Sequence, residues 1–346
     1  MINKIKRKLT NELRKTLKNI NSHYFLKSNS PILINSLNNF LSKPGKLIRP
    51  ILFVLGYLGF AKKEKSGLYK SAISMEFLHD FMLIHDDIID KSDTRRGAPS
   101  MHKTFSNHIS KYRNIKFNGQ DLSILAGDII YSIAIDIFLS IKENPYRKEQ
   151  ALKKLMQTAV YTGIGEFIEL MSGTKNIDQV KKNDIYKIYD FKTAYYSFSC
   201  PLSCGAILAG AKQKQIELIW KYGTYLGRAF QIKDDIQGLF FEEKITGKSS
   251  LVDLKESKKT LIIWLTSKLS GPREKNIIKN ILKKHNVSQS DLYSVKEIIN
   301  NSGAKAIAEK EILMLYKKAT SLIKLLKINT LYKQYLCNYA KEIILQ

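Results

Sequence analysis

The sequence contains few of the residues that interrupt helices, separate domains or form covalent bridges. Only 7 of the 346 residues are proline, 18 are glycine and 3 are cysteine. No stretch rich in proline, glycine or serine divides the chain, so a single domain is expected rather than several joined by linkers. Three cysteines do not form a disulfide framework for a chain of this length, and Cys200 and Cys204 lack the further ligands of a zinc site. We interpret them as ordinary buried thiols.

Long hydrophobic runs are also scarce. The longest run near the N-terminus, residues 51–60, is about half of the roughly 20 residues that a membrane-spanning helix needs. The first residues lack the apolar core of a signal peptide. Instead, apolar residues recur there at steps of three and four among lysines and arginines, at Ile2, Ile5, Leu9, Leu13, Leu17 and Ile20. This pattern predicts an amphipathic helix that packs on the body of the protein, with membrane-surface contact or organelle targeting as the alternative. We expect an intracellular, cytoplasmic protein without a transmembrane segment.

Strand-like alternation is rare, and helical periodicity dominates. Apolar residues at i, i+3, i+4 and i+7 recur over residues 67–91, 122–142, 148–172, 213–240 and 304–326. Short segments that contain glycine or proline fall between many of these stretches. The pattern predicts an all-α array of about a dozen helices, several of them apolar enough to lie in the core.

Acidic residues are in the minority. There are 31 of them against 57 lysines and arginines, which gives a net charge of +26. Such a charge suits nucleic acid, an anionic membrane surface or small anionic ligands. No compact zinc, homeodomain-like or RNA-recognition signature accompanies it. We interpret the lysines as solvated helix faces and expect no nucleic-acid partner. A basic helical nucleic-acid-binding protein stays an alternative, which a gel shift at physiological salt would reveal.

The acidic residues that are present include two clusters within apolar, helix-like sequence: Asp86, Asp87 and Asp90, then Asp234 and Asp235. Carboxylates among leucines and isoleucines cost free energy unless a cation meets them. Mg²⁺ is a natural partner, because it takes a few carboxylates together with phosphate oxygens and water. On a helix, Asp86 and Asp90 lie about 40° apart on one face, whereas Asp87 is turned away by about 100°. The first cluster therefore predicts a magnesium site that holds a diphosphate.

Basic residues flank the first cluster on both sides. Arginine binds phosphate well because its planar guanidinium presents a fork of donors. A histidine seven residues before Asp86 lies on nearly the same helix stripe. As groups that would meet the bound anions we single out Lys46, Arg49, His79, Arg95 and Arg96.

Together these motifs resemble the polyprenyl synthetase family of trans-isoprenyl diphosphate synthases. The matching segments, in family order, are Gly45-Lys46-x-x-Arg49-Pro50, Glu76-Phe77-x-His79, Asp86-Asp87-x-x-Asp90, Arg95-Arg96-Gly97, Ala126-Gly127-Asp128, Lys192-Thr193, Phe230-Gln231-x-x-Asp234-Asp235, Gly247-Lys248 and Asp253-Leu254-x-Glu256-Ser257-Lys258-Lys259-Thr260. The resemblance implies an isoprenoid-synthase-type helical bundle around a central active-site cavity. It implies one domain over residues 1–346, made of N-terminal amphipathic helices (1–40), a catalytic core (41–265) and C-terminal helices (266–346).

The resemblance also implies roles for individual residues. Mg²⁺, with three ions expected per active site, would be held by Asp86, Asp87, Asp90, Asp234 and Asp235. Isopentenyl diphosphate would be held by Lys46, Arg49, His79 and Arg96. The allylic diphosphate would be held by Arg95, Lys192, Lys248 and Lys258. Thr193 and Gln231 would lie near the reacting carbon, and with Lys192 and the five aspartates they complete the implied catalytic set. The implied reaction is a head-to-tail condensation of the two diphosphates by a homodimer.

Product length is expected to depend on Phe81 and Met82, five and four residues before Asp86. In the family, a large aromatic residue at the fifth upstream position blocks the growing chain. The sequence therefore favours geranylgeranyl diphosphate as the product, with farnesyl diphosphate as the alternative.

Four departures from the family pattern stand out. Gly238 occupies the place where many members have a third aspartate of the second cluster, Ser257 replaces a usual glycine, Lys259 a usual arginine, and Pro44 stands where a first glycine is common. None of these changes removes a residue that must touch substrate. A class I terpene cyclase stays a remote alternative, although the best candidate for its second metal motif, which begins at Asn183, lacks the later ligands.

Overall fold

Helices make up almost all of the regular structure. The computed structural model describes residues 1–43, 45–241 and 250–345. Among these residues, the only strands are β1 (Thr94–Arg95) and β2 (Ala98–Pro99), which pair as one antiparallel hairpin. The prediction of an all-α protein is therefore confirmed.

The chain forms two compact units. Unit 1 comprises Met1–Leu152 and Gly205–Gly210, and unit 2 comprises Lys153–Cys204 and Ala211–Gln346. Two helices contain residues of both units, α8 (Pro145–Gly173) and α10 (Cys200–Leu208). The expected single domain, with its boundaries near residues 40 and 265, stays a prediction.

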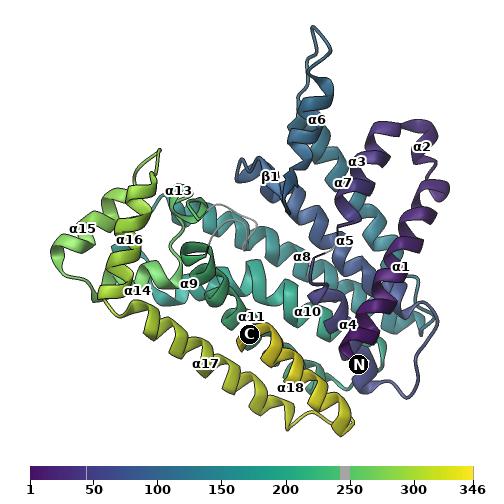
Figure 1. Cartoon of the computed structure of the whole chain (residues 1–346). Coiled ribbons are helices and arrows are strands. Elements are labelled where there is room, and N and C mark those ends of the chain that lie inside the picture. The colour runs from purple at the N-terminus through teal and green to yellow at the C-terminus, as the bar shows by residue number, and fades with distance from the viewer. Residues whose placement is uncertain (44, 242–249, 346) are drawn as a thin grey trace. The chain divides into compact units, whose positions relative to one another are not determined.

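Unit 1 is built around one central helix. Its helices are α1 (Ile2–His23), α2 (Leu26–Asn29), α3 (Pro31–Leu41), α4 (Ile48–Phe60), α5 (Leu68–Ile89), α6 (Met101–Ile109) and α7 (Gly119–Phe138). Helix α5 packs along α7, and α1 and α4 pack against it (Figure 1). Phe77 and Ile84 of α5 are fully buried, and Phe53 of α4 meets Phe138 of α7 edge to face, with ring centroids 6.1 Å apart. A helix surrounded in this way is apolar on most sides, which explains the dense apolar sequence of α5.

Helix α1 uses the predicted apolar stripe to pack on unit 1. It contacts α4 and α5, and its buried residues are Ile5, Leu9, Leu13, Thr16 and Ile20. The expectation that this basic amphipathic helix packs on the body of the protein is confirmed. None of the described helices combines the length and the apolar character that crossing a membrane requires.

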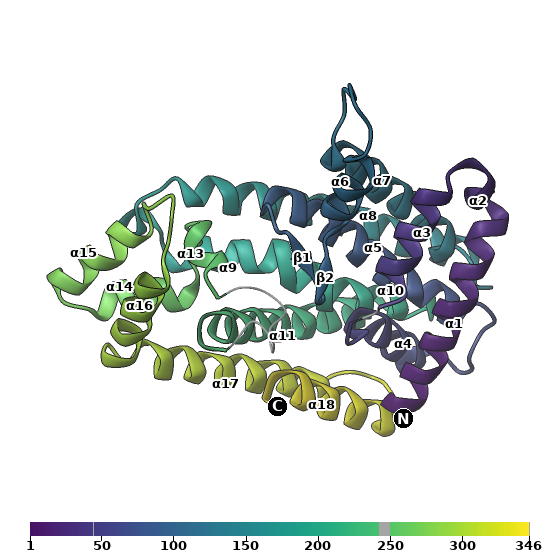
Figure 2. The same ribbon diagram turned by 45° about the horizontal axis from the view of Figure 1, so that its top comes forward.

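Unit 2 is built around α11 (Gln213–Phe240). Its other elements are η1 (Ile177–Gln179), α9 (Lys182–Ile188), η2 (Tyr189–Ser199), α13 (Val252–Lys255), α14 (Leu261–Leu269), α15 (Pro272–Ile281), α16 (Gln289–Asn301), α17 (Ala304–Ile323) and α18 (Thr330–Leu345). Helix α11 packs against η2 and α17, and α18 lies beside α11 and α17 (Figure 2). A Cβ on Gly227 of α11 would stand 2.3 Å from the Cα of Ala194, so glycine permits this close approach to η2. Cys200 and Cys204 are buried thiols, as predicted.

Candidate active site

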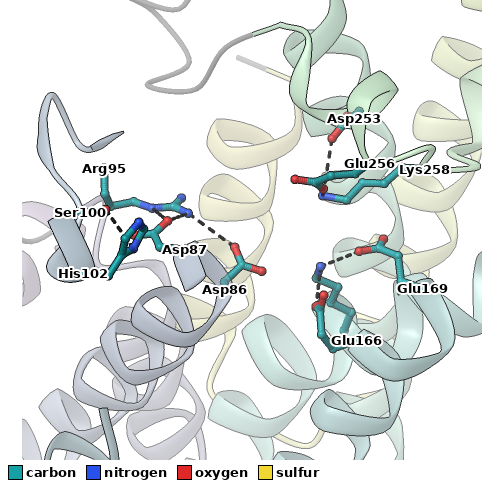
Figure 3. A network of polar contacts seen from close by, with 11 residues as sticks. Asp86, Asp87, Arg95, Ser100, His102, Glu166, Glu169, Asp253, Glu256 and Lys258 are labelled. Carbon is teal, nitrogen blue, oxygen red and sulfur yellow. Dashed lines mark hydrogen bonds and ion pairs between the residues drawn. The ribbon is translucent and has the colours of Figure 1, made fainter. Parts of the chain in front are cut away.

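The last turns of α5 present the first aspartate cluster in two directions. Asp87 is fully buried and accepts two hydrogen bonds from the Arg95 guanidinium, one of them from Nε at 2.8 Å (Figure 3). Asp86 is partly exposed, and its Oδ2 lies 3.5 Å from Nη2 of Arg95. Asp90 caps the end of the helix one turn later and is also half-buried. As the helical spacing predicted, Asp86 and Asp90 share a face while Asp87 turns to an arginine.

The β1–β2 hairpin places two adjacent arginines on two different acidic groups. Its turn residues, Arg96 (φ 52°) and Gly97 (φ 70°), are both left-handed, as a two-residue type I′ turn requires. Arg95, in β1, is only 8% exposed and faces Asp87. Burial lowers the pKa of Arg95, but the neighbouring aspartates more than offset this and raise the pKa above its usual value. Arg95 is therefore a fixed, permanently charged group beside the first cluster.

Two buried carboxylates on α5, Glu76 and Asp80, organise the second arginine. Nη2 of Arg96 lies 3.0 Å from Oδ1 of Asp80 and 3.8 Å from Oε1 of Glu76, and its Nη1 donates to the carbonyl of Lys43 at 2.8 Å. Burial raises the pKa of both carboxyls, and the charge of Glu76 raises that of Asp80 further, while Arg49 and Arg96 act in the opposite direction. Arg49 and Arg96 thus meet on one acidic pair. Sequence reasoning gave Asp80 no role, although its i, i+4 spacing from Glu76 repeats the signal of the first cluster.

Two more of the predicted basic residues, Lys46 and His79, belong to unit 1. Lys46 is exposed in the segment before α4, and His79 is half-buried on α5. Leu47 follows Lys46 with a left-handed φ of 55° and is only 2% exposed, so it anchors that segment in the core. The loop that carries Lys46 is thus held in place by an apolar residue.

Phe81, a residue of α5, packs against α7. Its ring centroid lies 5.0 Å from that of Tyr131 and 4.7 Å from that of His85. Phe81 and Met82 are both half-buried. A ring held on two sides has little freedom to move aside, which suits the predicted function of Phe81 as a barrier.

Lys192 lies on η2, an eleven-residue π-helix. Such helices are rare and occur frequently at functional sites. The Nζ of Lys192 lies 2.5 Å from Oε2 of Glu166 and 2.6 Å from Oε2 of Glu169, and Figure 3 shows these two glutamates on neighbouring turns of α8. Sequence analysis did not identify either glutamate; their i, i+3 spacing within an amphipathic helix was the available signal.

A chain of hydrogen bonds connects η2, α11 and α14. Thr193 Oγ1 donates to Oε1 of Gln231 at 2.6 Å, and Nε2 of Gln231 donates to Oδ1 of Asp235 at 2.8 Å. The hydroxyl of Tyr189 donates to Oδ2 of Asp235 and accepts from the backbone N–H of Leu261 at 2.8 Å. The structure therefore brings together Thr193, Gln231 and Asp235, three predicted residues, and adds Tyr189, which sequence reasoning missed.

The second aspartate cluster is divided between an exposed and a buried side chain. Asp234 is exposed, whereas Asp235 is only 5% exposed. Burial raises the pKa of Asp235 well above its usual range, and the charges of Asp253 and Asp234 add to this. A Cβ at position 238 would stand 3.7 Å from Oδ2 of Asp253. A carboxylate from another segment thus lies beside Gly238, where the family often has a third aspartate.

Lys258 is held by two acidic neighbours. Its Nζ lies 2.5 Å from Oε2 of Glu256 and 3.7 Å from Oδ1 of Asp253 (Figure 3). Lys248, which was also predicted to bind the allylic diphosphate, lies outside the described residues.

The donor chemistry of these groups fits Mg²⁺. In each unit the candidate ligands are carboxylate oxygens, some of them partly exposed, which are the ligands that a hard cation prefers. Guanidinium and ammonium groups stand beside them, and these match phosphate. An all-α fold with such groups defines a class of protein that handles diphosphates held through metal.

Comparison with known proteins identifies the family. Residues 30–299 match the model of the polyprenyl synthetase family. The chain is 30% identical over 299 residues to a geranylgeranyl diphosphate synthase of Sulfolobus acidocaldarius, covering 84% of this chain and 83% of that protein. It is 31% identical over 285 residues to a geranylfarnesyl diphosphate synthase of Aeropyrum pernix, covering 81% and 83%. A solved geranylgeranyl pyrophosphate synthase from Corynebacterium glutamicum, complexed with isoprenyl diphosphate and magnesium, superimposes with a TM-score of 0.89 at 26% identity, covering 99% of each chain.

The chain therefore belongs to the polyprenyl synthetase family, as its motifs predicted. It is a trans-prenyltransferase with the helical fold of the prenyl synthases. Enzymes of this family use Mg²⁺, in agreement with the carboxylate donors described above.

Proposed function

We propose that this enzyme condenses isopentenyl diphosphate head-to-tail with an allylic diphosphate to form geranylgeranyl diphosphate. One observation carries the proposal: the adjacent residues Arg95 and Arg96 serve two separate groups of unit 1. Arg95 lies on the aspartate cluster, next to Asp86 and Asp87. Arg96 lies with Arg49 on the buried acids Asp80 and Glu76, about two and three helical turns earlier. One substrate held through metal and a second held directly by cations need such a pair of sites.

Mg²⁺ is assigned to the less buried members of the aspartate clusters. We propose three ions, two held by Asp86 and Asp90 and one held by Asp234. Bound Mg²⁺ supplies positive charge that stabilises the diphosphate as it leaves the allylic carbon. The other two aspartates predicted as ligands, Asp87 and Asp235, are buried and accept hydrogen bonds from protein donors, so we assign them the orientation of those donors.

The cations divide between the two substrates in the same proposal. The allylic diphosphate is bound by Arg95, Lys192, Lys258 and Lys248. Isopentenyl diphosphate is bound by Lys46, Arg49, His79 and Arg96. The carboxylate partners of Arg95, Arg96, Lys192 and Lys258 fix the direction of these charged groups before substrate arrives, which lowers the ordering cost of binding.

The allylic cation that forms when the diphosphate leaves must be shielded from water. Thr193 uses its hydroxyl proton for Gln231, so the lone pairs of Thr193 Oγ1 remain available to the positive charge. The double bond of isopentenyl diphosphate attacks the allylic carbon, and a new carbon–carbon bond forms. The proton lost from the condensed product passes to the departed diphosphate.

Product length is assigned to Phe81 and, next to it, Met82. The Phe81 ring is held by Tyr131 and His85, so it forms a firm end for the growing chain. Relatives named geranylgeranyl diphosphate synthase support this length. Farnesyl diphosphate is the second candidate, because the same ring would stop the chain one unit earlier if it stood closer to the first cluster.

Incubation of the purified chain with Mg²⁺, isopentenyl diphosphate and each allylic primer in turn tests the function. We expect geranylgeranyl diphosphate as the main product by mass spectrometry, and none when Mg²⁺ is chelated. Farnesyl diphosphate as the final product would replace the assigned length. No condensation with any primer would overturn the proposal.

We also propose a homodimer formed through α8. This helix displays an apolar stripe at Val160, Ile164, Phe167 and Met171, each at least 40% exposed. The spacing places all four on one face, which suits burial against a second copy of the chain. Analytical ultracentrifugation should give a dimer for the wild type and a monomer for Phe167→Glu. A monomeric wild type at micromolar concentration would refute this assembly.

Two further expectations stay within the proposal. One is a single polyprenyl synthetase domain, supported by a family match that includes parts of both units. The other is a cytoplasmic location, which fractionation of cells that produce the tagged chain would test.

A further inference from the structure

The segment between α6 and α7, residues 110–118, is exposed at every position. It contains three large apolar side chains, Tyr112, Ile115 and Phe117, which are 53%, 38% and 46% exposed. Three basic residues alternate with them, at Lys111, Arg113 and Lys116. No acidic residue occurs within the segment. We name it the α6–α7 loop.

The α6–α7 loop is anchored at its end by the capping box of α7. Figures 1 and 2 both show it projecting beyond the ends of α6 and α7. At its end, Asn118 caps α7: its side chain accepts from the backbone N–H groups of Gln120 and Asp121, and Asp121 accepts from the N–H of Asn118 at 2.8 Å. Asp121, the nearest following acid, is held in the cap. Its single negative charge leaves the three basic residues of the loop in excess.

We propose that the α6–α7 loop docks the enzyme on an anionic phospholipid surface. Interfacial segments of this kind combine aromatic and aliphatic side chains, which enter the boundary of the acyl chains, with lysines and arginines, which meet anionic headgroups. Each basic residue near such a surface contributes about fivefold in affinity. The mixture also distinguishes lipid from nucleic acid: cations and the rings of Tyr112 and Phe117 suit both, but exposed Ile115 gains only from an apolar medium.

This inference goes beyond the proposed function and does not depend on it, because binding is measured without substrate. The probe is co-sedimentation of the full chain with vesicles of phosphatidylcholine, with and without phosphatidylserine. We expect binding only to the vesicles that contain phosphatidylserine, and loss of binding as salt screens the charges. Failure of the wild type to bind vesicles that contain phosphatidylserine would overturn the proposal.

Two triple variants separate the apolar from the electrostatic contribution. Replacing Tyr112, Ile115 and Phe117 with serine should weaken vesicle binding by about tenfold or more. The matched control replaces three equally or more exposed apolar residues elsewhere with serine, namely Tyr146, Tyr293 and Leu325. Replacing the basic residues of the loop with glutamine should weaken binding by about a hundredfold, from three steps of about fivefold each. Its control makes the same change in net charge at Lys62, Lys63 and Lys214, which are also exposed. If the loop variants and their controls lose vesicle binding equally, the effect is one of general charge or hydrophobicity. That result would refute docking through the α6–α7 loop.

A fluorescent reporter in the loop tests membrane contact without depending on the triple variants, which could fold poorly. Phe117→Trp places an indole in the loop, and its emission should shift to the blue when phosphatidylserine vesicles are added. An unchanged spectrum, or tighter loop-dependent binding to RNA than to vesicles at the same salt, would overturn the assignment. Condensation measured without vesicles should stay at the wild-type rate in all loop variants, so failure of the docking proposal and failure of the proposed function are distinguishable.

Discussion

Removal of one hydroxyl group, in Tyr189→Phe, tests how the hydrogen-bonded chain of Thr193, Gln231 and Asp235 in unit 2 is held. The Tyr189 hydroxyl donates to buried Asp235 and accepts from the N–H of Leu261, and Tyr189 itself is 4% exposed. Phenylalanine keeps the ring and its packing. The variant therefore leaves one carboxylate oxygen and one backbone N–H buried with a lost partner, and each such group costs about 1–3 kcal/mol. We expect the free energy of unfolding to fall by about 3 kcal/mol and the melting temperature by about 4 °C.

The same substitution should also affect the reaction. Asp235 holds Gln231, and Gln231 accepts the proton of Thr193. Once the carboxylate of Asp235 loses one of its two fixed donors, these side chains lose a common orientation, and kcat should fall about tenfold, a small part of what such preorganisation supplies. The KM for isopentenyl diphosphate should not change, because the residues assigned to that substrate belong to unit 1.

The measurements are thermal unfolding by circular dichroism and steady-state kinetics with both substrates. Tyr195→Phe is the matched control. Tyr195 lies on the same π-helix, and its ring packs against the rings of Tyr161, Phe191 and Trp220. The Asp235→Asn variant completes a double-mutant cycle, in which Tyr189→Phe should add little to the effect of Asp235→Asn. If Tyr189→Phe melts like the wild type and keeps its kcat, the hydroxyl does not hold Asp235.

Three further predictions concern the Phe81 barrier to chain growth, the binding of Mg²⁺ and the dependence of stability on pH. Phe81→Ala should lengthen the main product by at least one isoprene unit in mass spectrometry, and an unchanged product would remove this ring from the assignment of chain length. Asp90→Asn should lower kcat roughly a thousandfold and raise the Mg²⁺ concentration for half-maximal activity; a normal Mg²⁺ titration would argue against Asp90 as a ligand. Burial lowers the pKa of Lys259 from 10.5 to about 8, so between these pH values the unfolded chain binds more protons than the folded one and this lysine makes stability rise with pH. Denaturant unfolding from pH 8 to 10 should show a smaller rise in Lys259→Met than in the wild type, and parallel curves would contradict the shift.

Periodicity alone predicted the all-α class and the helical face shared by Asp86 and Asp90, because both depend on the 3.6-residue repeat. It could not predict that η2 is a π-helix. The change from an i→i−4 to an i→i−5 pattern lengthens each turn by about one residue. The eleven residues of η2 span too few turns for the sequence to reveal that longer repeat. Packing decides the outcome, since Gly227 lets α11 approach Ala194 of η2. The direction of Lys192 and Thr193 therefore depends on a neighbouring helix rather than on local sequence.

The arginine pair shows the same division between local and tertiary information. The motif Arg95-Arg96-Gly97 indicated a turn and two phosphate-binding groups. It did not indicate that the two side chains would reach different acids, because that depends on how the hairpin lies on α5. At Ser257 the local backbone explains the sequence. Its φ of 57° is left-handed, a conformation that favours the family's usual glycine and that serine adopts with some strain.

Gly238 gives the sharpest contrast between sequence and structure. From the sequence, the second cluster lacks a third acid and must rely on water and substrate. In the structure, Asp253 already supplies a carboxylate 3.7 Å from where a Cβ at residue 238 would stand. A restored aspartate would crowd Asp253 and the buried Asp235 instead of completing the site. Two like charges about 4 Å apart repel by about 4 kcal/mol at an effective dielectric of 20, and exposure to water reduces this to about 1 kcal/mol here.

We therefore predict that Gly238→Asp is about 1 kcal/mol less stable than Gly238→Asn, which has the same shape without the charge. The Mg²⁺ concentration for half-maximal activity should be the same in both variants. Denaturant unfolding and a Mg²⁺ titration of condensation measure the two quantities. Tighter Mg²⁺ use in Gly238→Asp alone would show that the third aspartate is missing after all. Equal use, with lower stability, would show that Asp253 fills that place from a different segment of the chain.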